Sequence, residues 1–71
     1  MRISTAGRYG LRIMLDIAMH AEHQWAPRMT IAQRQQVSAN YVAQLTRLLA
    51  ENGLLRTRKG PHGGYMLEKP S

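Results

Sequence analysis

The chain has 71 residues, with ten Lys or Arg, four Asp or Glu and no cysteine, which gives a formal net charge of +6. This length fits one small domain with a modest core, and the missing thiols exclude disulfides and cysteine-ligated metal centres within these residues. The positive charge favours a polyanionic partner such as nucleic acid, although ribosomal proteins, membrane-surface binders and solubilising surfaces are equally basic.

The first predicted helix runs from about 5 to 23, and Ser4 or Thr5 can cap its first turn. Apolar residues recur at helical spacing and predict a wide buried face, made of Tyr9, Leu11, Ile13, Met14, Leu15, Ile17 and Ala18. The opposite side is predicted to face solvent for the most part and carries Arg8, Arg12, Asp16, His20 and Glu22.

Two shorter helices are predicted over 28–36 and 39–52. The start of the earlier helix is open, because Pro27 favours an early start and Thr30, as a cap, favours a late one. Ser38 is expected to cap the later helix.

These two helices match a helix-turn-helix pattern. A small residue, Ala32, stands where the helices would touch, and the apolar positions that lock their crossing are Ile31, Val37, Val42 and Leu45. A narrow buried stripe is predicted to continue through Leu48 and Leu49. Gln36 occupies a turn position where glycine is common, and a left-handed residue there would cost about 1 kcal/mol.

The rest of the chain predicts an antiparallel hairpin with strands at about 54–59 and 64–68, joined by a turn rich in glycine and proline. The predicted fold class is mainly α with a small β-hairpin. It is a winged helix-turn-helix of three helices plus a two-stranded wing, and one domain is expected to cover 1–71.

The third helix is predicted to turn Asn40, Gln44 and Arg47 outward. Asn and Gln can bind adenine edges with two hydrogen bonds, and Arg can do the same for guanine. We therefore expect Asn40 and Gln44 to contact bases or phosphates, whereas Arg47 either contacts a phosphate or is simply solvated. Ala43 offers only apolar contact, for instance with a thymine methyl group.

Basic residues gather at the predicted wing, with Lys59 at its tip. Arg56 and Arg58 alternate with Thr57 and are expected to point to one face. The glycines of the turn let the chain approach a sugar-phosphate wall closely, or they serve the tight turn alone. About five neutralised phosphates would give a log–log salt slope near −4 to −5.

The aromatic side chains are predicted to have different roles. Tyr41 is expected to be partly buried with its hydroxyl near a phosphate, and Tyr65 to pack on the core face of the hairpin. Trp25 is expected to cover an edge of the core or to contact a segment outside these residues.

Several strings of the sequence resemble a known family of bacterial regulators. They are MRIST at 1–5, GRYGLR at 7–12, VSANY at 37–41, NGLL at 52–55 and KGPHGGY at 59–65. On these strings the chain resembles the IscR/NsrR-type (BadM-like) winged-helix transcriptional regulators over essentially its whole length. GRYGLR and KGPHGGY together are the specific part of the match.

The resemblance implies a homodimer on palindromic promoter DNA. It implies base contacts from Asn40, Tyr41, Gln44 and Lys59. Of these residues, Lys59 is expected to reach into the minor groove. The residues predicted to lie on the DNA backbone, from the resemblance and the wing together, are Arg2, Ser4, Thr5, Arg8, Ser38, Arg47, Arg56, Arg58, Gly60 and Gly63.

The chain departs from the family pattern at three positions. Gln36 replaces the usual turn glycine, Ala43 stands where some relatives carry Glu, and Lys59 stands where relatives often have Arg. Lysine lacks the planar guanidinium of arginine, which fits a narrow minor groove, so Lys59 is expected to lower the specificity of DNA binding.

Full-length relatives are longer, with a cysteine cluster and a dimerising helix after the wing. Neither feature lies within these residues, so no cofactor or metal is predicted here, and an iron–sulfur cluster would require a longer parent protein. A homodimer is expected for a full-length relative, although the dimer helix is absent from this sequence.

The sequence therefore predicts a sequence-specific DNA-binding transcriptional regulator, expected to be a repressor, or the isolated DNA-binding domain of one. Recognition helix 39–52 would enter the major groove, and basic wing 56–64 would reach phosphates and the minor groove of double-stranded DNA. The alternative is a winged-helix protein-interaction or assembly module, which would carry an exposed apolar patch in place of the basic wing. RNA binding is a minor alternative, because it typically requires aromatic side chains exposed on a sheet to stack on bases, and this chain has few aromatic residues.

No Ser/His/Asp set, paired carboxylates or phosphate-cradling motif is evident, so an enzyme is not predicted. No apolar run approaches the ~18 residues that cross a bilayer. The start of the chain carries no apolar stretch followed by a small-residue cleavage site. No membrane partner and a cytoplasmic location are therefore expected.

Overall fold

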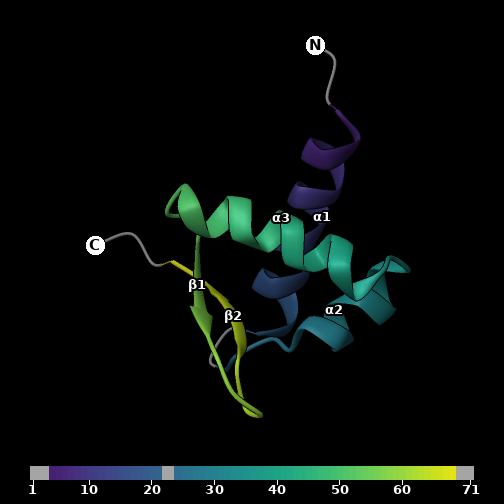
Figure 1. The fold of residues 1–71 in the computed structure, drawn as a ribbon. Coiled ribbons are helices and arrows are strands. Elements are labelled where there is room, and N and C mark those ends of the chain that lie inside the picture. Colours follow the sequence, from purple (N-terminus) through teal and green to yellow (C-terminus); the bar gives the residue numbers. More distant parts are fainter. Residues whose placement is uncertain (1–3, 22–23, 69–71) are drawn as a thin grey trace.

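Three helices precede a two-stranded antiparallel sheet in the computed structural model, which describes residues 4–21 and 24–68 (Figure 1). The elements in chain order are α1 (Thr5–His20), α2 (Arg28–Gln35), α3 (Ala39–Glu51), β1 (Leu55–Arg58) and β2 (Gly64–Leu67). This arrangement confirms the predicted winged helix-turn-helix. Each element is slightly shorter than the sequence predicted.

α1 begins where Ser4 caps it, because the Ser4 hydroxyl oxygen accepts a hydrogen bond from the backbone N–H of Gly7 at 3.1 Å. The helix ends at His20 rather than at 23, since Ala21 leaves helical geometry with φ −133° and ψ 44°. Residues 22–23 lie outside the described part of the chain.

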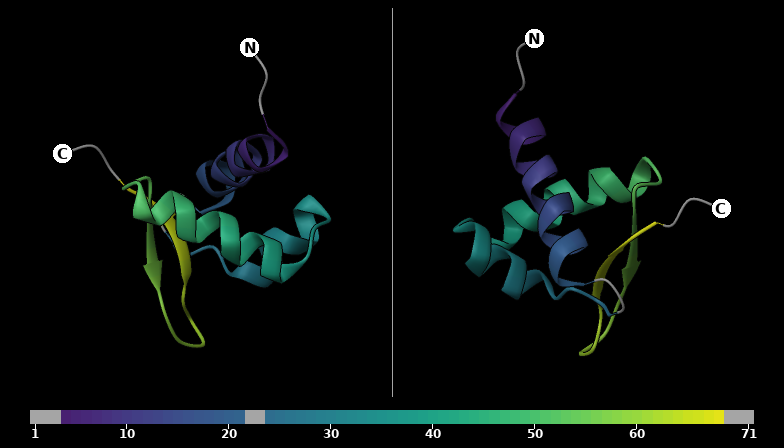
Figure 2. Two further views of the ribbon diagram at one scale, coloured as in Figure 1. Left: turned by 45° about the horizontal axis from the view of Figure 1, so that its top comes forward. Right: turned by 180° about the vertical axis from the view of Figure 1, so that it is seen from behind.

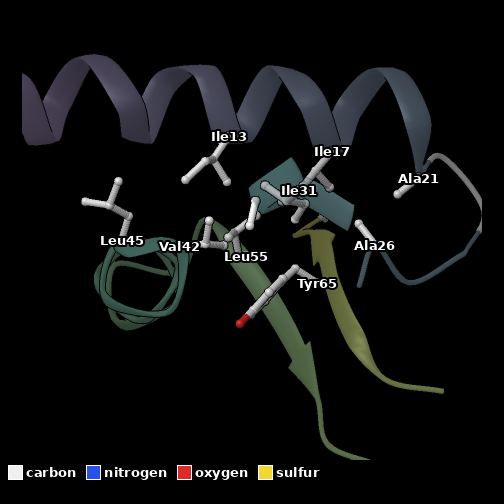
Figure 3. Packing of buried hydrophobic residues seen from close by; sticks show 10 residues of the cluster. Ile13, Ile17, Ala21, Ala26, Ile31, Val42, Leu45, Leu55 and Tyr65 are labelled. Carbon is white, nitrogen blue, oxygen red and sulfur yellow. The ribbon is translucent and has the colours of Figure 1, made fainter. Parts of the chain in front are cut away.

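The buried face of α1 is narrower than the sequence predicted. Ile13 and Ile17 are almost completely buried, whereas Leu11 and Leu15 expose more than half of their surface. Figure 3 shows α1 lying along one edge of the core, with α2, α3 and the sheet all on the same side of it. Ala18, which was also placed on that face, is exposed. Contact from one side supports only one buried stripe, so the predicted burial of Leu11, Leu15 and Ala18 was wrong.

A buried ion pair joins α1 to α2. The Asp16 side chain is 1% exposed, and one of its carboxylate oxygens lies 2.6 Å from a terminal nitrogen of Arg34. Gln35 donates a further hydrogen bond to Asp16 at 2.8 Å. Burial raises the pKa of Asp16, but the hydrogen bonds from Arg34 and Gln35 and the charge of Arg34 outweigh burial and lower the pKa overall. The prediction that Asp16 faces solvent was therefore wrong.

α2 begins at Arg28, so the early start favoured by Pro27 is the observed one. The helix ends at Gln35, and the next residue, Gln36, takes a left-handed conformation with φ 56° and ψ 45°. The Val37 N–H then bonds back to the Ala32 carbonyl oxygen at 3.1 Å. The turn thus closes in the usual helix-ending geometry without a glycine.

Replacing Gln36 by Gly is expected to raise the free energy of unfolding by about 1 kcal/mol, because glycine adopts left-handed conformations without strain. Urea unfolding followed by circular dichroism measures this change. Gln33 is an exposed residue within the helical part of α2, so Gln33→Gly serves as the control. That control should lower stability by about 1 kcal/mol. Equal effects of the two substitutions would contradict the assigned role of Gln36.

The core forms where the three helices meet the inner face of the sheet (Figure 3). The helix-turn-helix positions are buried as predicted, with Val37 half-buried beside Ile31, Ala32, Val42 and Leu45. Leu48 is 54% exposed, so its predicted place in the buried stripe was wrong. It lies about 100° around α3 from Leu49, which carries it past the edge of the core.

The hairpin has two different faces. Thr57 of β1 stands opposite Tyr65 of β2. Leu55 shares their face because side chains alternate along a strand, and this face meets the core through Leu55 and Tyr65. Arg56 and Arg58 lie on the other face, as predicted from their alternation.

A short segment before α2 extends the sheet. The Ala26 N–H donates to the Tyr65 carbonyl oxygen at 2.8 Å, and the Tyr65 N–H donates to the Ala26 carbonyl oxygen at 2.9 Å. Gly64 packs tightly here, because a Cβ added to it would stand 2.2 Å from the Ala26 oxygen. This pairing, which the sequence did not predict, ties the hairpin to the start of α2.

Candidate nucleic-acid interface

The outward side of α3 carries residues predicted to contact DNA bases. Asn40 and Gln44 are exposed, and the helical repeat places them opposite Val42 and Leu45, which face the core. They stand one turn apart and therefore project in similar directions. The protein's own interior does not cover this side of the helix.

Tyr41 lies at the first turn of α3 and is half-buried, as the sequence predicted. The hydroxyl oxygen of Ser38 accepts a hydrogen bond from the Tyr41 N–H at 3.0 Å and so caps the helix. The Tyr41 ring packs edge-to-face on the ring of Tyr9, with centroids 5.8 Å apart and planes at 76°. α1 therefore fixes the position of Tyr41.

Arg47 extends the outward side of α3 toward its C-terminal end. Its Nε lies 3.2 Å from an oxygen of Glu51, and the two side chains are 82% and 57% exposed. An exposed pair of this kind, four residues apart on a helix, contributes only about 0.3–0.5 kcal/mol. The Arg47 guanidinium is thus free to exchange Glu51 for a phosphate at small cost.

The basic residues of β1 gather around one aromatic ring. The guanidinium carbons of Arg56 and Arg58 lie 5.7 Å and 6.0 Å from the centre of the half-buried Trp25 ring. Both distances are within or at the range of cation–π attraction. Trp25 therefore holds two cations on the outer face of the hairpin, a role that the sequence analysis did not identify.

The tip of the hairpin is exposed at Lys59 and Gly60. Gly60 has φ +106°, a conformation that side chains disfavour, and the Gly63 N–H donates to its carbonyl oxygen at 3.1 Å. A Cβ on Gly63 would stand 2.0 Å from the Arg58 carbonyl oxygen. The glycines are therefore required by the turn itself, whatever the tip contacts.

The remaining predicted backbone-contacting residues stand at the start of α1. Ser4, Thr5 and Arg8 are exposed, and Arg2 lies outside the described residues. Figures 1 and 2 show the first turn of α1 and the tip of the hairpin on opposite sides of α3. The structure thus separates the predicted set into two groups that flank the recognition helix.

An open groove runs between α3 and the hairpin, and the start of α2 also lines it. Arg28, which the sequence analysis did not select, lies in this groove and donates from Nε to the Tyr65 hydroxyl oxygen at 3.1 Å. The two residues are far apart in the sequence, and no local pattern announces their contact. Spacing alone gave no means of finding Arg28.

Across residues 4–21 and 24–68, no helix has the length and apolar character needed to span a membrane. Within the same part of the chain, no three His, Cys, Asp or Glu side chains come together as a metal-binding group.

The chain has close relatives among characterised proteins. It is 42% identical over 69 residues to the HTH-type transcriptional regulator IscR of Serratia proteamaculans and to that of Pectobacterium carotovorum. Each alignment covers 97% of this chain and 42% of the relative. The chain thus spans less than half the length of these relatives, which are described as transcriptional regulators and not as enzymes, in agreement with the prediction.

Solved structures show the same fold. CymR of B. subtilis, described as the global cysteine regulator, matches with a TM-score of 0.86 at 40% identity, covering 97% of this chain and 54% of CymR. IscR of T. potens matches with a TM-score of 0.83 at 36% identity, covering 97% of this chain and 50% of that one. The model of the Rrf2 family, described as iron-dependent transcriptional regulators, matches residues 3–71. The resemblance to IscR-type regulators is thereby confirmed, and the chain belongs to the Rrf2 family.

Proposed function

We propose that this chain is the sequence-reading DNA-binding part of a transcriptional regulator. α3 enters the major groove, and the hairpin holds the adjacent backbone and minor groove. The observation that carries the proposal is the exposure of Asn40 and Gln44 on α3, a helix whose adjoining face at Ala43 and Arg47 lines a groove with the cationic hairpin. The family membership and the names of the relatives support the same role.

The proposed contacts divide into two classes. Base edges are contacted by Asn40, Tyr41, Gln44 and Lys59. Phosphates are contacted from α1 and α3 by Ser4, Thr5, Arg8, Ser38 and Arg47, and from the hairpin by Arg56, Arg58 and the backbone near Gly60 and Gly63. Phosphate contacts set the register of the protein on the duplex, and base contacts set the sequence preference.

Iron takes no part in this proposal, although the family description mentions it. The chain has no cysteine, and residues 4–21 and 24–68 bring no three other metal-ligating side chains together. These residues do not fit an iron centre.

The longer relatives suggest how the domain works in a whole protein. We propose that the full-length protein binds as a homodimer, because two copies of this domain match a palindromic site by symmetry. Binding over a promoter would exclude polymerase, so we also propose that the regulator represses. A reporter gene behind the selected site would show lower expression in the presence of the full-length protein, and unchanged or higher expression would contradict repression.

Two substitutions test the proposed contacts. The preferred site is first selected from a randomised duplex library, and affinity is then measured by fluorescence anisotropy over a salt series. Gln44→Ala should lower the preference for the selected base by about tenfold, because a bidentate base contact supplies about 1–3 kcal/mol of discrimination. Lys59 is proposed to reach the minor groove, which distinguishes bases poorly and where the negative potential of the flanking phosphates is strong. Lys59→Ala should therefore weaken binding to all duplexes and make the log–log salt slope shallower by about 0.9.

Gln24→Ala is the control, since Gln24 is exposed and lies outside the proposed contact set. It should bind like the wild type. If Gln44→Ala keeps the wild-type base preference and Lys59→Ala keeps the wild-type salt slope, neither residue has the DNA contact proposed for it. Salt-independent binding by the wild-type chain, or none at low salt, would reject DNA reading altogether.

A further inference from the structure

The groove between α3 and the hairpin has a composition suited to a nucleic-acid backbone. Its volume is about 1020 Å³, which is just above the ~300–1,000 Å³ range of small-molecule pockets. Ala43 and Ala50 of α3 and Gly64 of the hairpin line it with little side-chain bulk. An extended polymer strand can therefore approach the protein backbone closely.

The charges along this groove favour a polyanion. The cations that line it are Arg28, Arg47 and Lys59. Arg58 also lines it, but its guanidinium lies over the Trp25 ring on the outer face of the hairpin. The carboxylate among its lining residues belongs to Glu51, and it is already in contact with Arg47. The excess of positive charge means that a strand of phosphates would be attracted along the length of the groove.

The geometry of a DNA duplex then determines which part of the DNA lies in the groove between α3 and the hairpin. One sugar-phosphate backbone separates each major groove from the neighbouring minor groove. A duplex that takes α3 in its major groove and the tip of the hairpin in its minor groove must therefore pass that backbone between α3 and the hairpin. This step rests on the proposed function.

Arg28 is placed to receive a phosphate of that backbone. Its Nε donates to the Tyr65 hydroxyl, which leaves the two terminal amino groups of the guanidinium for another acceptor. Within residues 4–21 and 24–68, Arg28 has no carboxylate partner, since the ion pairs there belong to Arg34 and Arg47. A guanidinium oriented in this way is suited to bind a phosphodiester through its fork.

We propose that Arg28 is a phosphodiester-binding residue of this groove and that the Tyr65 hydroxyl positions it. The Tyr65 ring lies in the core, while its hydroxyl points away from the other labelled core side chains (Figure 3). Tyr65 thus gives the Arg28 guanidinium a rigid support. It acts through Arg28 and needs no contact with DNA itself.

Arg28→Gln tests the proposal on a mixed-sequence duplex, measured by anisotropy over a salt series with the full chain. Affinity should fall by about tenfold, because a hydrogen bond to a charged group is worth about 1.5–3 kcal/mol. The salt slope should become shallower by about 0.9, as for one phosphate contact. Ala18→Glu is the charge-matched control, because it also removes one positive unit from the net charge at an exposed position on α1. That control should keep the wild-type slope.

Tyr65→Phe tests the positioning role, because it removes the hydroxyl and keeps the ring in the core. In the wild-type background it should weaken binding about threefold, which is within the free energy of one neutral hydrogen bond, about 0.5–1.5 kcal/mol. In the Arg28→Gln background it should have no further effect on affinity. Thermal unfolding by circular dichroism verifies that each variant is folded.

The outcomes separate this inference from the proposed function. Salt-dependent binding by the wild type, with unchanged affinity and slope in Arg28→Gln, overturns the role of Arg28 and leaves DNA reading intact. If Tyr65→Phe lowers affinity by the same factor in the wild-type and Arg28→Gln proteins, the positioning role of Tyr65 is overturned. A wild type that does not bind the duplex overturns the inference together with the function on which it rests.

Discussion

Asp16→Ala is expected to lower the free energy of unfolding by about 3 kcal/mol, which is the low end of the ~3–5 kcal/mol range for breaking a buried ion pair. The substitution leaves the Arg34 guanidinium and the Gln35 amide facing a void where they met a carboxylate. The low end applies because the Arg34 side chain is 34% exposed and can regain water. A chain of this size has about 4–11 kcal/mol of total stability, so the loss is severe. Urea unfolding followed by circular dichroism measures it.

The second ion pair of the described residues supplies the control. Glu51→Ala removes the exposed partner of Arg47 and should change stability by less than about 0.5 kcal/mol. If Asp16→Ala and Glu51→Ala cost the same, the buried pair would not be what joins α1 to α2.

The same pair predicts a dependence on pH. Because the pKa of Asp16 is lowered in the folded state, its contribution is fully present above the unfolded pKa of about 3.9 and is lost as pH falls through the lower folded pKa. The wild type should therefore lose stability below about pH 4 more steeply than Asp16→Asn, which has no carboxyl to protonate. Urea midpoints measured from about pH 6 down to about pH 2.5 show the difference. Parallel curves for the two proteins would contradict the assignment.

Gly64→Ala is expected to cost about 3 kcal/mol and to weaken DNA binding. The added Cβ would stand 2.2 Å from the Ala26 carbonyl oxygen, and Gly64 has φ +149°. The oxygen is backbone and is held by the Tyr65 N–H at 2.9 Å, so it cannot move without breaking the pairing. Backbone strain of about 1–3 kcal/mol adds to two lost hydrogen bonds of about 0.5–1.5 kcal/mol each.

Binding should weaken because the same pairing sets where the hairpin stands relative to α2 and α3. Gly10→Ala is the matched control, since no atom lies within 4 Å of its added Cβ outside the helix's own backbone. Gly10 lies within α1, so this control should gain about 0.5–1 kcal/mol. Unfolding curves and anisotropy on both variants measure the two effects. Gly64→Ala with wild-type stability would show that the close approach to Ala26 is not a constraint.

Features set by local chemistry were predictable from the sequence. The periodicity of Ile31, Val42 and Leu45 identified the helix-turn-helix, and all three are buried. Ser38 was identified as a cap by its residue type, and its hydroxyl does accept from Tyr41. The glycine-rich turn identified the hairpin, because few residue types tolerate such backbone conformations.

Features that depend on contacts between distant segments were not predictable. The spacing of α1 gave a wide apolar face, but which part is buried depends on how many neighbours cover it. Asp16 looked like a surface residue because its partner Arg34 belongs to another helix. The contact of Arg28 with Tyr65 spans 37 residues, and Trp25 meets Arg56 only after the hairpin folds back.

The central claim is that α3 and the hairpin hold one duplex at the same time. An NMR titration of the isotope-labelled chain with its selected duplex tests this claim most directly, because each backbone amide reports its own surroundings. The account predicts that signals from residues 40–47 and 58–64 shift together at the same DNA concentration, whereas those of Leu15 and Ala18 on the outer side of α1 stay in place. Shifts confined to α1, or to only one of the two segments, would contradict it.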